Sequence, residues 1–236
     1  MVSAGAANFT SSADRLHEVG LFQGTGTTAS GAPQYDLDRA PTRAEAAVML
    51  VRLLGKEADA KALTYTAPFT DLEGWEAPYV QYLYDNKLTT GATATTFEPK
   101  AKCSAQMYTT FLLRSLGYSD AQNGDFTYTG ALDFAADNVG LIDESFCDTN
   151  NFLRDNVAAM SLEALATPVK ATDITLLDKL IADGAIDQSK AKPESTTKVN
   201  MSISSVKKRG NVDDCRFFPD FLFWAIGASS NTMLVG

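Results

Sequence analysis

Apolar residues recur with helical spacing in several short stretches, and the clearest stretch is residues 41–55, PTRAEAAVMLVRLLG. Thr42 and Glu45 form a capping-box pattern, in which each side chain can satisfy a backbone N–H that a helix start leaves unpaired. Gly55 then supplies a C-terminal stop. The buried stripe has the i, i+3, i+4 spacing of an amphipathic helix: Ala46, Met49, Leu50, Leu53 and Leu54.

The same organisation recurs along the chain, so that the sequence reads as three copies of one unit. The copies run through about residues 8–55, 69–117 and 126–165. Each contains a short amphipathic helix, a turn, an extended segment that opens on an aromatic residue, and a second helix. A repeat of this length predicts an array of stacked helical units rather than one continuous core pattern.

The second helices of the three copies agree without gaps. In each copy, the first position of the helix signature follows the aromatic residue by seven positions. The next position holds an arginine in the first and third copies and an alanine in the second. The aligned residues are Tyr35, Phe97 and Phe146, then Thr42, Ser104 and Leu153, then Arg43, Ala105 and Arg154.

These motifs resemble the S-layer homology repeat of bacterial cell-surface proteins. The matching motifs are FTDLEGW at residues 69–75, FEP at 97–99 and TRAE at 42–45. The resemblance covers residues 8–166 and implies a pseudo-threefold, mainly helical unit. It also implies that grooves between repeats bind an anionic, pyruvylated secondary cell-wall polysaccharide without covalent chemistry. Because Ala105 replaces the arginine and Leu153 replaces the cap hydroxyl, only one or two grooves are expected to be competent.

The predicted fold class is therefore mainly α, with three helix-loop-helix repeats, an extra helix and an irregular C-terminal tail. The extra helix is predicted at residues 172–187, where apolar residues again have helical spacing. A stretch rich in Pro, Ser and Thr follows, which is typical of a linker. The predicted units are repeats at 1–60 and 61–120, a degenerate repeat with the packing helix at 121–187, the linker at 188–206, and a segment of unassigned role at 207–236.

The candidate ligand-binding residues combine cations, a flat aromatic face and glycines that allow close backbone approach. Arg43 is a cation in the first turn of a helix, where the helix dipole is unfavourable to it unless Glu45 or a ligand carboxylate pairs with it. A tryptophan after a turn is also common in a core, and turn glycines also serve positive φ alone. With the resemblance, the candidates for glycan binding are Arg43, Trp75, Arg154, Gly24, Gly91 and Glu45.

Charge and composition narrow the possible partners. The formal net charge of −9 and the pI of about 4.6 argue against general binding to nucleic acid or anionic lipid. The sequence lacks the apolar run of about 20 residues that a membrane span needs, and no signal peptide is visible at the N-terminus. The three cysteines have no zinc-site spacing, so no metal is expected.

A catalytic function is not predicted. His17 is the only histidine, and the carboxylates have no spacing that singles out an acid–base pair. We expect no catalytic residues and no cofactor. The function predicted is non-covalent anchoring at the bacterial cell surface, outside the cell. Two alternatives remain: an assembly module of a surface layer that contacts other surface-layer proteins, and the anchoring part of a larger cell-wall enzyme.

Overall fold

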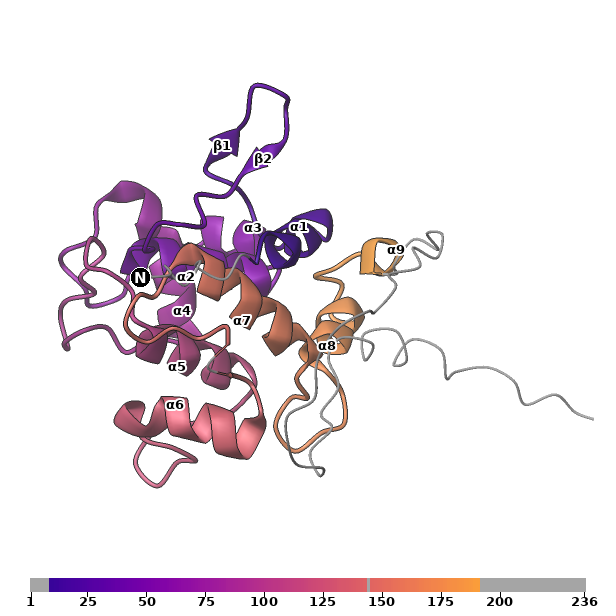
Figure 1. Ribbon diagram of the computed structural model, residues 1–236. Helices are drawn as coiled ribbons and strands as arrows, with labels where there is room; N and C mark the ends of the chain where they lie inside the picture. The colour runs from indigo at the N-terminus through magenta and orange to yellow at the C-terminus, as the bar shows by residue number, and fades with distance from the viewer. Residues whose placement is uncertain (1–8, 144, 192–236) are drawn as a thin grey trace, which may run out of the picture. The chain divides into compact units, whose positions relative to one another are not determined.

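Three long helices begin at the predicted capping positions and carry much of the buried surface (Figure 1). They are α2 (Arg43–Leu53), α5 (Ala105–Ser115) and α7 (Arg154–Ala166) in the computed structural model, which describes residues 9–143 and 145–191. The side chains of Leu50, Leu112 and Met160, one on each helix, are fully buried. The prediction of a mainly α fold is confirmed.

The starts of these helices differ in their caps. The Thr42 hydroxyl accepts the Glu45 N–H at 3.2 Å, and the Glu45 carboxylate accepts the Thr42 N–H at 2.8 Å, which confirms the capping box. Ser104 caps α5 through its hydroxyl. The hydroxyl is missing before α7, where Leu153 instead donates its N–H to the Asn156 side chain at 2.7 Å. The third copy therefore keeps only one of the two capping-box bonds, the one from the backbone N–H of the cap residue.

Substitution of Thr42 by alanine should lower the free energy of unfolding by about 1 kcal/mol, since the variant leaves a backbone N–H of α2 without its side-chain acceptor. Chemical denaturation followed by circular dichroism measures the effect. Thr42→Ser is the matched control, because serine keeps the hydroxyl and should cost less. Equal losses in the two variants would contradict the capping argument.

A shorter helix from each copy packs against a long helix. The shorter helices are α1 (Thr10–Glu18), α4 (Ala77–Asp85) and α6 (Ala131–Phe134), the last continuing into the π-helical turn η3 (Ala135–Val139). α4 packs on α2, α6 packs on α5, and α1 packs on α7. In each pair the two helices come from different predicted copies, so the first and third copies are in direct contact.

The remaining elements belong to the connections. Ten residues separate Gly24 from Tyr35, whereas five separate Gly91 from Phe97. The longer connection forms an antiparallel hairpin that projects from the helices (Figure 1). The elements are the hairpin strands β1 (Gly26–Thr27) and β2 (Pro33–Gln34), helix α3 (Glu57–Lys61), and the 3-10 turns η1 (Gly74–Glu76) and η2 (Tyr128–Gly130).

The extra helix, α8 (Leu176–Ala182), is shorter than the predicted range of 172–187. Thr175 caps it by accepting the Asp178 N–H at 3.1 Å, and the Thr175 backbone pairs with Pro168 in an isolated bridge. These contacts fix the preceding residues in an extended turn, so Ile174 is exposed and does not join the buried stripe.

The chain divides into two compact units, Met1–Asp187 and Gln188–Gly236. The described part of the second unit is the short helix α9 (Gln188–Ala191), which falls at the start of the predicted linker. The rest of that linker and the segment at 207–236 lie outside the described residues. None of the helices in the described ranges is long and apolar enough to cross a membrane.

Candidate functional site

The start of α2 lies on the extended segment of the second copy. The backbone N–H groups of Arg43 and Ala44 donate to the carbonyls of Ala101 and Pro99, at 2.8 and 3.1 Å. Asp71 fixes the start of that segment, since its carboxylate accepts the N–H groups of residues 97 and 98. These bonds outweigh burial and, with the charge of Arg43 nearby, hold the pKa of Asp71 below its usual range.

Arg43 projects across this junction. Its Nε donates to the Phe97 carbonyl at 2.7 Å, its Nη1 lies 3.0 Å from the Met107 Sδ, and its guanidinium carbon lies 5.1 Å from the centre of the Phe97 ring. Glu45 does not pair with Arg43, because Arg39 holds both Glu45 oxygens at 2.8 Å. Within the described ranges, no carboxylate forms an ion pair with Arg43.

A pocket of about 420 Å³ opens beside Arg43. Its walls come from α2, from the turn before the extended segment of the second copy, from α5, and from η2 of the third copy. The lining is rich in hydroxyl and charged groups. It includes Arg43, Thr89, Thr90, Gly91, Thr110 and Tyr128.

Two aromatic residues line the pocket, the buried Phe111 and the exposed Tyr128. Tyr128 lines the pocket with 47% of its surface exposed, whereas Trp75, on η1, is 59% exposed and is not among the lining residues. Both residues occupy the entry of the first helix in their copies. The repeat alignment therefore places Tyr128 at the position that Trp75 takes in the second copy. Of the predicted residues, Arg43 and Gly91 meet in this pocket.

An ion pair that the sequence did not reveal forms another part of the wall. Arg114 donates two hydrogen bonds to the carboxylate of Asp120, at 2.8 and 2.6 Å, and a third to the Leu88 carbonyl at 2.8 Å. Burial is the largest single influence and opposes ionisation of Asp120, but the hydrogen bonds and the charge of Arg114 together outweigh it and hold the pKa of Asp120 below its usual range. The pair therefore fixes the turn that carries Gly91 against α5.

Arg154 lies at a second junction, where α7 meets the extended segment of the first copy. Its side chain is buried, with only 4% of the residue exposed. Its Nε donates to the Tyr35 carbonyl at 2.8 Å, its Nη1 lies 3.4 Å from the Met49 Sδ, and the Phe22 ring covers the guanidinium at 5.7 Å. Burial lowers the pKa of Arg154.

Two further predicted residues belong to this second junction. Glu45 lies close enough for its charge to act on Arg154, although Arg39 holds its carboxylate. Gly24 lies at the base of the hairpin, where an added Cβ would meet the Gln34 carbonyl oxygen at 2.4 Å. The predicted residues thus divide between two places, and Trp75 lies apart from the Arg43 pocket.

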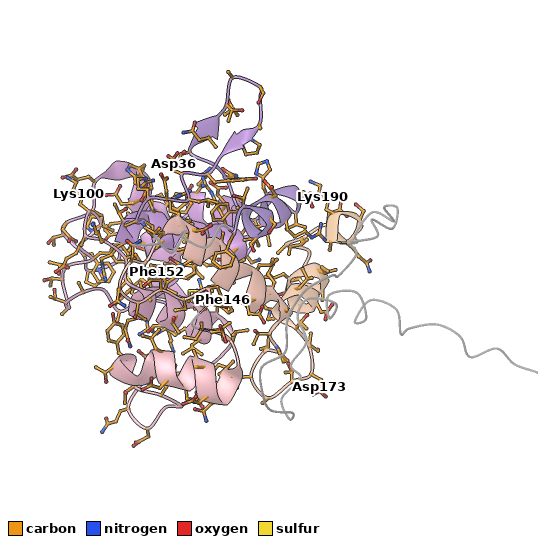
Figure 2. The ribbon with its side chains drawn as sticks, in the orientation of Figure 1. Asp36, Lys100, Phe146, Phe152, Asp173 and Lys190 are labelled. Atoms are coloured by element: carbon orange, nitrogen blue, oxygen red, sulfur yellow. The ribbon has the colours of Figure 1, made fainter. Side chains whose placement is uncertain are left out.

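The third junction carries alanine in place of arginine, at Ala105. The neighbouring Gln106 donates through its side chain to the Tyr128 carbonyl and so ties α5 to η2. Phe146, the aromatic residue of the third copy, is buried together with Phe152 (Figure 2). The junctions therefore differ: one has a part-buried arginine at a pocket, one a buried arginine and one no arginine.

Comparison with known proteins identifies part of the chain. Residues 68–104 match the family model of the S-layer homology domain. The chain is 28% identical over 109 residues to an endoglucanase of Bacillus sp. (strain KSM-635), covering 41% of this chain and 12% of the enzyme. It is 30% identical over 112 residues to the middle cell wall protein of Brevibacillus brevis, covering 47% of this chain and 10% of that protein.

A surface layer protein of Brevibacillus choshinensis is similar to the same degree, at 30% identity over 112 residues, with 47% of this chain and 10% of that protein covered. The chain thus spans about a tenth of the length of these relatives. The prediction that the chain contains an S-layer homology domain is confirmed, at the copy in which the motif is most complete.

Proposed function

We propose that this chain, which carries an S-layer homology domain, anchors a bacterial surface protein to the cell wall without covalent chemistry, by holding an anionic wall polysaccharide in the Arg43 pocket. The family match and the cell-wall and surface-layer relatives support a role at the cell wall and a location at the cell surface. The proposal assigns binding rather than catalysis to this chain.

One observation carries the choice of pocket. Arg43 reaches a pocket of about 420 Å³ with hydrogen bonds to a carbonyl and a sulfur, neither of which is an anion. A ligand carboxylate would supply the direct ion pair that Arg43 forms with no carboxylate of the described residues, although Asp71 lies near enough to feel its charge. The hydroxyls of Thr89, Thr90 and Thr110 and the exposed ring of Tyr128 suit the hydroxyl groups and the apolar face of a sugar.

We also propose that the three copies are arranged with pseudo-threefold symmetry. The three cross-copy helix pairs support this arrangement. In each pair, the first helix of one copy packs on the second helix of the preceding copy: α4 on α2, α6 on α5 and, from the first copy back to the third, α1 on α7. The three contacts therefore close a ring. The backbone contacts agree as well. The N–H of Arg43 donates to Ala101, and that of Arg154 donates to Arg39, each four residues after the aromatic residue of its extended segment.

Co-sedimentation with bacterial sacculi tests the proposal. The purified chain should sediment with intact sacculi and stay in solution after acid extraction has removed the secondary polymer. Binding that survives the extraction would contradict a polysaccharide ligand. A folded chain that sediments with neither preparation would favour the alternative of an assembly module acting through protein contacts.

The similarity to an endoglucanase favours a second candidate for what is anchored. In this version, the described repeats still bind the wall, and they retain the catalytic part of a larger cell-wall enzyme. A fusion of residues 1–191 to a reporter protein tests the anchoring role apart from its cargo. Retention of the reporter on sacculi is the expected result, and its loss together with a folded fusion would contradict both versions.

A further inference from the structure

Arg43 and Arg154 make one equivalent backbone contact although they lie at different junctions. The Nε of Arg43 donates to Phe97 at 2.7 Å, and the Nε of Arg154 donates to Tyr35 at 2.8 Å, where Phe97 and Tyr35 are equivalent aromatic residues. In both cases Nη1 reaches a methionine Sδ, at 3.0 and 3.4 Å. The two methionines lie one helical turn apart in the repeat register, because Met49 corresponds to Phe111 and Met107 to Glu45. The feature that the two arginines share is therefore the Nε bond to the equivalent carbonyl.

The turns that precede the two extended segments differ in the residue that lies beside the arginine. In the L-x-x-G turn, Thr89 follows Leu88 in the second copy, and Phe22 follows Leu21 in the first. Thr89 lines the Arg43 pocket. Phe22 is only 2% exposed, and its ring lies over the Arg154 guanidinium.

We propose that the second junction is a closed copy of the Arg43 pocket, and that Phe22 is the residue that closes it. This inference deepens the proposed function and rests on it for the ligand, a carboxylate-bearing saccharide. Phe22 stacks on the cation and fills the space that a ligand occupies beside Arg43. The number of working grooves is thus set by one turn residue in each copy, in addition to the arginine.

The charges around Arg154 are compatible with a carboxylate ligand. Glu45 is the nearest acidic residue on α2, and its charge is balanced by the bidentate bond from Arg39. Asp36, labelled in Figure 2, is half-buried, and its carboxylate accepts hydrogen bonds from the side chains of Thr25 and Gln34, so its charge already has partners. Glu98 takes the equivalent position at the Arg43 pocket, directly after the aromatic residue, so this acidic neighbour does not distinguish the two junctions.

The test is Phe22→Thr, which gives the first copy the residue of the second. Reaction of the full chain with phenylglyoxal, followed by peptide mass spectrometry, reports the accessibility of each arginine without any ligand. In the native chain Arg43 should react and Arg154 should be protected. In Phe22→Thr the reaction of Arg154 should accelerate about tenfold or more, because access no longer requires local opening of the core.

Calorimetric titration then counts the sites, with the acidic oligosaccharide fraction that acid releases from sacculi as the probe. One site is expected for the native chain and two for Phe22→Thr, and the added site should disappear in Phe22→Thr/Arg154→Ala. If Arg154 becomes reactive in Phe22→Thr but neither the native chain nor any variant binds the probe, the result would support the closing role of Phe22 and contradict the proposed function. A folded Phe22→Thr with protected Arg154 would overturn the inference.

Removal of a buried ring also threatens folding, so the reciprocal variant gives an independent test. Thr89→Phe should place a ring over Arg43, protect it from phenylglyoxal and abolish the single site of the native chain. Thr95→Phe is the matched control, since Thr95 is exposed in the connection that follows this turn and does not line the pocket. Equal reactivity of Arg43 in Thr89→Phe and in the native chain would overturn the inference even if Phe22→Thr fails to fold.

Discussion

Replacement of Arg43 by alanine is expected to weaken binding to cell-wall sacculi by roughly 1.5–3 kcal/mol, about a 10- to 150-fold rise in the dissociation constant. This is the range for a hydrogen bond that involves a charged group. The loss should fall on binding because Arg43 faces the pocket without a carboxylate partner in the described part of the chain. Quantitative co-sedimentation over a range of protein concentrations measures it.

The same substitution should have a smaller effect on folding. The Nε of Arg43 donates to the Phe97 carbonyl and so helps to join two copies, and loss of this bond should cost about 1 kcal/mol of unfolding free energy. Arg43→Lys separates the effects further. Lysine keeps the charge but cannot reproduce the planar fork of the guanidinium, so binding should recover only in part.

Lys100→Ala is the control for a general charge effect. Lys100 is largely exposed, pairs with Glu73 and lies at the periphery of the molecule (Figure 2). Lys100→Ala removes one positive charge, as Arg43→Ala does, but from a residue that does not line the pocket. If the two variants bind sacculi equally, the Arg43 pocket is not the binding site. If Arg43→Ala unfolds while its residual folded fraction binds normally, Arg43 is structural.

The helices could be predicted from the sequence because their signals are local. The capping pair of Thr42 and Glu45, the stripe through Leu50, and the seven-residue step from an aromatic residue to the helix cap all concern residues within about two turns of each other. The structure contains each of these features. The start of the extra helix was predicted less accurately, because the cap at Thr175 and the bridge to Pro168 delay the helix to Leu176.

The candidate site could be predicted only in part, because its remaining features depend on contacts between distant segments. Arg43 and Gly91 followed from the repeat pattern. The bond from Arg114 to the Leu88 carbonyl did not, since these residues lie 26 positions apart and meet only when the turn of the second copy packs on α5. The burial of Arg154 also has a non-local cause: Phe22, far away in the sequence, supplies the ring that covers it.

The largest effect on stability is expected from Gly91→Ala. Gly91 has a φ of +83°, and an added Cβ would lie 2.3 Å from the Phe69 ring, 2.6 Å from the Thr93 carbonyl oxygen and 2.8 Å from that of Thr96. The left-handed conformation costs about 1–2 kcal/mol for a residue with a Cβ. Overpacking adds about 1–3 kcal/mol, so the free energy of unfolding should fall by roughly 2–5 kcal/mol.

Gly31→Ala isolates the steric part of this effect. Gly31 has the same φ of +83°, but no atom lies within 4 Å of an added Cβ. It should therefore lose only about 1–2 kcal/mol, the cost of the left-handed conformation. The difference between the two variants, measured by chemical denaturation, gives the energy of the contacts around Gly91.

Binding to sacculi should also be weaker in Gly91→Ala than in Gly31→Ala, because of where the turn lies. The turn that carries Gly91 also places Thr89 and Thr90 in the wall of the Arg43 pocket, and Arg114 holds this turn through the Leu88 carbonyl. A Cβ at residue 91 must displace either the turn or the Phe69 ring behind it. Gly91→Ala should thus weaken sacculus binding even at temperatures where it stays folded, whereas Gly31→Ala should bind as the native chain does. Native binding by a folded Gly91→Ala would mean that the ligand does not depend on this turn.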